Sequence, residues 1–216
     1  MDFFFNSTTP LDLGKPADKF RQNVEAIRIL KACQAENRPA TSEEQAALSL
    51  YVGWGDAQIL DKLLNDSAFL TDSEFASAKA SALNAHFTDV AVIGAMWEGV
   101  THLGINNPMM SIFDPSAGVG HFKSAAPETL RSAEWVEIEL DQLTAGMLSL
   151  LHPNSHVYAQ GYEETYLPDE KFDLAISNVP FGSYGVGFST QKLPRFVKSS
   201  IHDFFFANTV ALLRPG

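Results

Sequence analysis

A short apolar run that ends in a carboxylate and passes into a glycine-rich turn is the feature that most constrains the fold of this chain. Residues 109–113 are largely apolar, Asp114 follows them, and Gly118 and Gly120 lie in the turn. Glycines there let backbone amides approach a ligand at the carboxyl edge of a parallel sheet. A carboxylate at the strand tip repels a pyrophosphate and suits an ammonium group. The pattern favours S-adenosylmethionine over a nicotinamide dinucleotide, although a plain tight turn explains the glycine spacing equally well.

The segments around this turn alternate between strand-like and helical patterns. The strand-like segments are residues 109–113, 135–140, 156–159 and 172–177. The helical segments are residues 89–101, 141–150 and 201–213. Strands that alternate with helices are typical of a parallel, doubly wound sheet. We therefore expect the α/β fold class.

The first 83 residues predict helices instead. Four apolar residues recur at helical spacing behind Pro16, which suits a first helical turn: Phe20, Val24, Ile27 and Leu30. Thr41 and Thr71 each precede a Glu by three residues, which is the spacing of a capping box. We predict a helical N-terminal region over residues 1–83, serving as a packing layer, and an α/β domain over residues 84–216.

The overall composition indicates the cellular compartment in which the protein is expected. The chain has 216 residues, 45% of them hydrophobic, and a formal net charge of −11. No apolar run reaches the roughly 18 residues that span a bilayer, and residues 1–3 lack the basic start of a secretory signal. The single cysteine, Cys33, excludes an internal disulfide and fits a reducing compartment. We expect a cytoplasmic protein without membrane contact.

The sequence contains no strong signal for a metal site or for a nucleic-acid-binding surface. The six histidines are scattered at spacings that form no metal site, so no metal is expected. The chain also carries no basic run, although phosphate neutralisation supplies most non-specific affinity for nucleic acid. If DNA is the substrate, a local patch or another polypeptide segment must hold it.

Glu139 lies at the end of the second predicted strand, nineteen positions after Gly120. An acid at this distance, at the tip of the second strand, can accept both hydroxyls of a ribose. Asp141 is the neighbouring candidate, but it is better placed to cap the helix that follows.

Residues 177–182 follow the fourth predicted strand and read Ser-Asn-Val-Pro-Phe-Gly. The Asn178 amide oxygen and the next backbone carbonyl can both accept hydrogen bonds from an exocyclic amine. The ring of Phe181 can stack on a planar base brought out of a duplex. The alternative is a Pro-Gly turn with a buried Phe.

The glycine-turn segment and the Asn178 segment together resemble motifs of a known family. Residues 114–122 and 178–181 resemble motifs I and IV of the adenine-N6 DNA methyltransferases. Three further segments are similar to the methyltransferase region of DarB-like antirestriction proteins, which join an adenine methylase to a helicase: residues 51–55, 83–88 and 200–206. The resemblance runs from about residue 45 to the end of the chain.

The resemblance implies a fold, a reaction and a set of site residues. The fold is a partial Rossmann-like S-adenosylmethionine-dependent methyltransferase domain, with its first four strands, behind the helical N-terminal region. The reaction is methyl transfer from S-adenosyl-L-methionine to adenine N6 in DNA, within a larger modification or antirestriction protein. The implied cofactor-binding residues are Phe87, Thr88, Asp114, Ser116, Gly118, Gly120, Glu139 and Tyr162. The implied catalytic residues are Asn178, Val179, Pro180 and Phe181.

The chain departs from the family pattern in three places. Val179 replaces the first of two usual prolines, which keeps the carbonyl but loses rigidity. Gly161 stands where many relatives place an acid that reads the cofactor's adenine. The chain stops at Gly216, where the family turns into a fifth strand. We therefore expect an amino-terminal piece that needs a C-terminal recognition or helicase region to hold DNA.

Two other functions stay open. The family's catalytic theme also serves protein glutamine and RNA guanine amino groups, so the acceptor can be a protein or RNA. The chain can also be a catalytically incompetent fragment that binds the cofactor. Separate measurements of cofactor binding and DNA methylation distinguish these functions.

Overall fold

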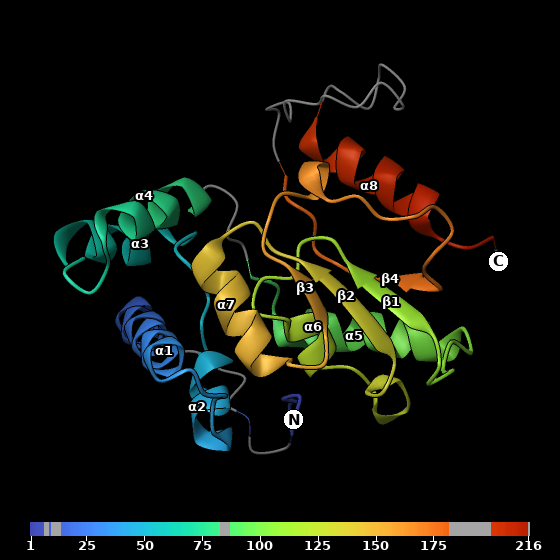
Figure 1. The fold of residues 1–216 in the computed structure, drawn as a ribbon, viewed down its shortest axis with the longest axis horizontal. Coiled ribbons are helices and arrows are strands. Elements are labelled where there is room, and N and C mark those ends of the chain that lie inside the picture. Colours follow the sequence, from blue (N-terminus) through green and yellow to red (C-terminus); the bar gives the residue numbers. More distant parts are fainter. Residues whose placement is uncertain (7–8, 10–13, 83–86, 182–199, 216) are drawn as a thin grey trace.

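A four-stranded parallel sheet forms the centre of the α/β part of the molecule (Figure 1). The computed structural model describes all residues except 7–8, 10–13, 83–86, 182–199 and 216. The strands are β1 (Ser111–Asp114), β2 (Glu134–Ile138), β3 (His156–Tyr158) and β4 (Leu174–Ala175). Their order is β3-β2-β1-β4, and each adjacent pair is parallel. The expected α/β fold class, with four strands of a doubly wound sheet behind N-terminal helices, is confirmed.

Eight α-helices lie within the described residues. They are α1 (Pro16–Glu36), α2 (Ser42–Leu48), α3 (Ala57–Asn65), α4 (Asp72–Ser81), α5 (Val90–His102), α6 (His121–Ser124), α7 (Gln142–Leu151) and α8 (Ile201–Leu212). Two short 3-10 helices are also present: Glu128–Leu130 and Tyr162–Glu164. No helix in this described part is long and apolar enough to cross a membrane.

The predicted capping residues start the helices where the sequence places them. The hydroxyls of Thr41 and Thr71 accept the Glu44 and Glu74 backbone N–H groups, and both capping boxes are complete. Asp141 caps α7 by accepting the Thr144 N–H at 2.9 Å. These local predictions are confirmed, because each depends on side chains within one turn of the helix start.

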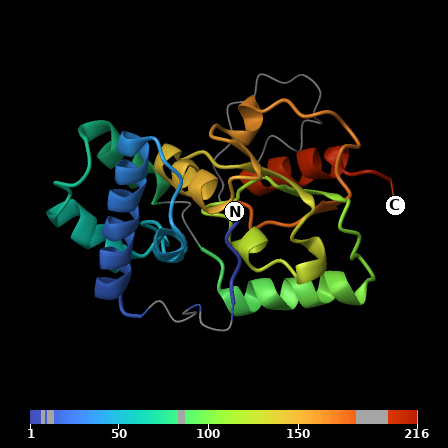
Figure 2. The same cartoon turned by 60° about the horizontal axis from the view of Figure 1, so that its bottom comes forward.

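Helices cover both faces of the sheet, and each strand sends alternate side chains to opposite sides. Phe113 of β1 packs with α8 residues, among them Phe204. Its neighbour Ile112 packs with Trp97 of α5 and Phe122 of α6 on the other face. Figure 2 shows α5 running along the sheet and the N-terminal helices standing to one side.

The N-terminal helices share a hydrophobic core with α7. Leu30 of α1 and Leu48 of α2 are buried with Met147 of α7. The start of the chain reaches the same helix, because the Phe3 N–H donates to the Leu151 carbonyl at 2.8 Å. The predicted boundary between residues 83 and 84 lies outside the described residues, so the division into two regions stays a prediction.

The fourth strand is shorter than the sequence predicts. Residues 172–177 are expected to form a strand, but only Leu174–Ala175 pair with β1. Phe172 instead forms a parallel bridge with Leu213, which follows α8. At the other end, the Ser177 hydroxyl donates to Asp114 at 2.6 Å. Phe172 is therefore paired outside the β1 ladder, whereas Asp173 and Ile176 still donate backbone N–H groups to β1 carbonyls.

Candidate active site

A cavity of about 450 Å³ opens where the four strands end. Its lining includes Ser116 after β1, Glu139 after β2, Gln160 after β3 and Asn178 after β4. The carboxyl ends of parallel strands meet at one sheet edge, which is where open α/β sheets bind ligands. The volume falls within the range of small-molecule sites, roughly 300–1,000 Å³.

Eight of the twelve predicted site residues line this cavity. They are Phe87, Thr88, Ser116, Gly118, Glu139, Tyr162, Asn178 and Pro180. The other four, Asp114, Gly120, Val179 and Phe181, do not line it. The fold therefore brings together segments that are up to 93 residues apart in the chain. The chemical roles of all twelve residues stay predictions.

Asp114 is buried next to the cavity residue Ser116 and does not itself line the cavity. Its side chain is fully buried, and its Oδ1 atom accepts the Ser116 N–H at 3.1 Å and the Ser177 hydroxyl at 2.6 Å. Burial raises the pKa of Asp114 to about 8. The sequence suggests that this carboxylate meets an ammonium group. In this structure the side chain ties the glycine turn to the segment after β4, and its role toward an ammonium group stays a prediction.

The glycine turn has left-handed backbone at both glycines, with φ of +58° at Gly118 and +83° at Gly120. A Cβ atom at Gly120 would lie 2.5 Å from His152 Cδ2 and 2.6 Å from Leu148 Cδ1. Gly118 faces the cavity, where an added Cβ would lie 3.3 Å from the Phe87 ring. Gly120 thus allows the turn to pack on α7, and Gly118 keeps space beside Phe87.

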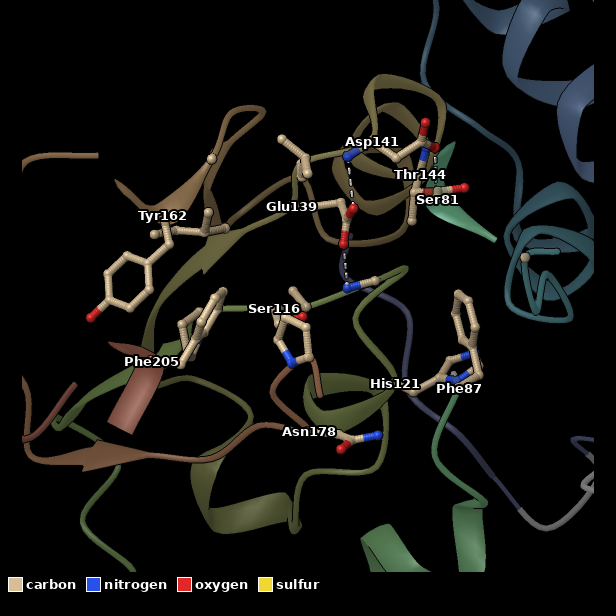
Figure 3. Close-up of a pocket in the computed structure, with 18 of the residues that line it drawn as sticks. Ser81, Phe87, Ser116, His121, Glu139, Asp141, Thr144, Tyr162, Asn178 and Phe205 are labelled. Carbon is tan, nitrogen blue, oxygen red and sulfur yellow. Dashed lines mark hydrogen bonds between the residues drawn. The ribbon is translucent and has the colours of Figure 1, made fainter. Parts of the chain in front are cut away.

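Glu139 is held by two backbone amides at the tip of β2. Its Oε2 atom accepts the Gly118 N–H at 2.9 Å, and its Oε1 atom accepts the Asp141 N–H at 2.8 Å (Figure 3). The half-buried carboxylate borders the cavity, and desolvation raises its pKa to about 7. It is an oriented acceptor for ligand hydroxyl groups.

Aromatic rings close the two ends of the cavity (Figure 3). At one end, the Tyr162 ring lies 5.2 Å from that of Phe205 of α8, measured between centroids. At the other end, Phe87 meets His121 edge-to-face at 5.5 Å. The Nε2 atom of His121 lies 2.8 Å from the Ser49 carbonyl oxygen, and burial lowers the pKa of this ring. A neutral His121 therefore donates from Nε2 to that carbonyl.

The predicted catalytic segment divides between the cavity and its surroundings. Asn178 and Pro180 line the cavity. Val179 packs against the core beneath α8, and Phe181 is 58% exposed. An exposed aromatic side chain beside a cavity offers a flat face to a ligand that enters from outside.

Several residues of the lining have no site role in the sequence prediction. Among them are Tyr51, Ser77, Ser81, His121, Asp141 and Phe205. Ser77 and Ser81 share one face of α4, four residues apart, but their spacing alone does not distinguish this face from an ordinary small-residue surface. His121 follows Gly120 directly, which is the one local signal that could have identified it. Across the described residues, no group of three or more His, Cys, Asp or Glu side chains is placed to hold a metal ion.

No family model matches the chain. The chain is, however, similar to a curated phage protein. It is 23% identical over 208 residues to Defense against restriction protein B of Escherichia phage P1. The two are distant relatives. The alignment covers 94% of this chain but only 8% of the phage protein. The homology therefore concerns a small part of that much longer protein.

Two solved structures are similar to parts of the fold. One is a candidate class I S-adenosylmethionine-dependent methyltransferase from Listeria monocytogenes, with a TM-score of 0.46 and 14% identity over 91% of this chain and 71% of that one. The other is a candidate RNA methyltransferase from Pyrococcus horikoshii, with a TM-score of 0.38 and 20% identity over 47% and 51% of the two chains. These superpositions are too loose to bear on the reaction of this chain.

Proposed function

We propose that this chain binds S-adenosyl-L-methionine in the cavity and methylates adenine N6 in DNA, as part of a larger modification or antirestriction protein. The observation that carries the proposal is the convergence of both predicted residue groups on one cavity. Cofactor candidates such as Glu139 and Tyr162 line it together with the catalytic candidates Asn178 and Pro180.

The donor and acceptor groups of the cavity fit this cofactor. The carboxylate of Glu139 would accept the two ribose hydroxyls, since its position is already set by two backbone N–H groups. Tyr162 would pack on the adenine ring, and Phe87 and Thr88 would border the methionine part. Gly118 leaves between the turn and Phe87 a space that a Cβ would fill. When bound, S-adenosylmethionine supplies an electrophilic methyl group.

The catalytic segment would hold the acceptor amine. The side-chain oxygen of Asn178 and the carbonyl of Val179 would accept hydrogen bonds from adenine N6–H groups, which aims the nitrogen lone pair into the cavity. Pro180 restricts the backbone between these acceptors and Phe181. Rate enhancement would come mainly from positioning, since no covalent nucleophile is needed.

The exposed ring of Phe181 favours a flipped base as the acceptor. It lies next in sequence to Pro180, which lines the cavity, and 58% of its surface is accessible. A base taken out of the helical stack needs an aromatic or apolar surface to replace its lost neighbours. The homology to a phage protein named for defence against restriction also supports DNA as the target.

The test separates cofactor binding from methyl transfer. Titration calorimetry with S-adenosylmethionine measures the first, and radiolabelled methyl incorporation into unmethylated DNA, RNA and protein measures the second. The assay uses physiological ionic strength, because lowering the salt strengthens the repulsion between a chain of net charge −11 and a polyanion. Asn178→Ala should lower methyl transfer about a hundredfold and keep most of the cofactor affinity. Asn65→Ala, at the end of α3 and outside the cavity lining, is the matched control.

Each outcome identifies a different function. Methylation of adenine in DNA that depends on Asn178 supports the proposal. Label in RNA or protein alone assigns another amino acceptor. Cofactor binding without transfer to any acceptor identifies a binding module, and absence of cofactor binding overturns the proposal.

A further inference from the structure

A series of hydrogen bonds connects the N-terminal helices to Glu139. It begins at Ser77 of α4, whose hydroxyl donates to Asp141 Oδ1 at 2.8 Å. The Asp141 backbone N–H then donates to Glu139 Oε1 at 2.8 Å. The second oxygen of Glu139 accepts the Gly118 N–H at 2.9 Å. α4 and the glycine turn are thus linked through two neighbouring acidic residues, Asp141 and Glu139.

Asp141 is the central residue of this hydrogen-bond series, and both oxygens of its carboxylate accept hydrogen bonds. It is 8% exposed, and its Oδ2 atom accepts both the Thr144 N–H at 2.9 Å and the Thr144 hydroxyl at 2.6 Å. Since Oδ2 is used to cap α7, Oδ1 is the oxygen that can reach another element. Ser77 supplies that contact across 64 residues of sequence.

The same face of α4 borders the cavity. Ser77, Ala80 and Ser81 all belong to its lining, as does Asp141. Tyr51, from the loop after α2, lies against the same cluster, and burial together with the Asp141 charge raises the pKa of its hydroxyl. The helical region therefore forms one wall of the site next to the acidic residues.

We propose that Ser77 is a positioning residue through which the N-terminal helical region orients Glu139 for the ribose hydroxyls of the cofactor. This inference rests on the proposed function. Ser77 restrains Asp141, the Asp141 N–H restrains one oxygen of Glu139, and the glycine turn restrains the other. A carboxylate held at both oxygens meets a diol without first losing conformational freedom, and such preorganisation increases affinity.

The test uses one substitution, one control and two ligands. Ser77→Ala removes the bond to Asp141, whereas Ser73→Ala makes the same chemical change in the same helix, outside the cavity lining, and removes only an exposed 3.2 Å contact with the Thr71 hydroxyl. Ser77→Thr keeps the hydroxyl and should restore binding. The ligands are S-adenosylhomocysteine and its 2′-deoxy analogue, whose dissociation constants are measured by calorimetry.

We expect Ser77→Ala to weaken S-adenosylhomocysteine binding about fivefold, as for one lost hydrogen bond. Binding of the 2′-deoxy analogue should change much less, since it presents one hydroxyl fewer to Glu139. Ser73→Ala should change neither constant. An equal loss for both ligands would make Ser77 a general structural contact and overturn the inference, and so would no loss for either.

Amide hydrogen exchange without ligand separates this inference from the proposed function. Ser77→Ala should speed exchange at the Asp141 and Gly118 amides, which both donate to Glu139, and Ser73→Ala should not. If the wild-type chain binds neither ligand, the proposed cofactor is wrong. Unchanged exchange at both amides in Ser77→Ala would still refute the positioning role.

Discussion

At the scale of single residues, the turn after β1 depends on a position without room for a side chain. Gly120 has a φ of +83°, and an added Cβ would lie within 2.6 Å of both His152 and Leu148. The His152 ring is fully buried, and its Nε2 atom lies 3.2 Å from the Gly120 carbonyl oxygen. The ring thus supports the turn from below and cannot move aside without losing its own packing.

Gly120→Ala should therefore destabilise the fold by roughly 3 kcal/mol, through left-handed strain and overpacking together. Gly99→Ala is the control, since Gly99 is exposed in α5 and an added Cβ there meets nothing within 4 Å. That change should stabilise the fold by up to about 1 kcal/mol. Urea denaturation measures both, and equal effects of the two substitutions would contradict this account of the turn.

At the scale of elements, α4 is a short helix that depends on its first turn. Thr71 and Glu74 form a reciprocal capping box, and Glu74 also pairs with Lys31 of α1 at 2.7 Å. The helix has little amphipathic character, because small residues such as Ser77 and Ala80 occupy much of its surface. Apolar side chains such as Phe75 and Ala78 pack into the N-terminal core, and the cap and ion pair at the first turn add to what holds α4 over the cavity.

Thr71→Ala should lower the unfolding free energy by about 1 kcal/mol and also weaken cofactor binding, since α4 carries Ser77. Thr41→Ala removes the equivalent cap of α2 and should cost similar stability. No α2 residue lines the cavity, so this control should leave cofactor affinity unchanged. Chemical denaturation and calorimetry on both variants provide the comparison. Equal losses of affinity would show that global stability alone governs the site.

At the scale of the whole molecule, several ionisable groups are buried in their neutral forms. Burial raises the pKa of Asp114 to about 8 and that of Glu137 to about 7, from ordinary values of 3.8 and 4.5. Burial also lowers the pKa of His121, and lowers that of His152 to about 3. The carboxyl groups and the imidazoles therefore affect stability in opposite directions at acidic pH.

Stability should fall as the pH rises from 6.5 to 8. Unfolded histidines are about half protonated at pH 6.5, so their deprotonation offsets part of this fall up to about pH 7.5. The folded chain still holds protons on Glu137 and Asp114 that the unfolded chain has released, so raising the pH favours unfolding. Glu137→Gln should remove up to about 1 kcal/mol of this dependence. Exposed Glu98→Gln should not, and melting curves with equal pH slopes for both variants would refute the explanation.

The predictable part of the fold is local in origin. Caps at Thr41, Thr71 and Asp141 are found where the sequence places them, because each cap bonds within a few residues of itself. The fourth strand is predicted less well, since its length depends on pairing with residues after α8. Strand limits are set by neighbours in space, which a propensity pattern does not contain.

For the candidate site, the sequence by itself determined which segments end at the binding edge. The reason is that each strand end is followed within a few residues by a glycine turn or a helix-capping residue. It also identified Glu139 and Asn178 as polar groups at that edge. Only the tertiary structure decided that Asp114 turns inward while Asp141 borders the cavity, and that Ser77 bonds to Asp141 across 64 residues. The physical reason is that a buried polar group must find its partner in space, and that partner is set by how helices and strands pack.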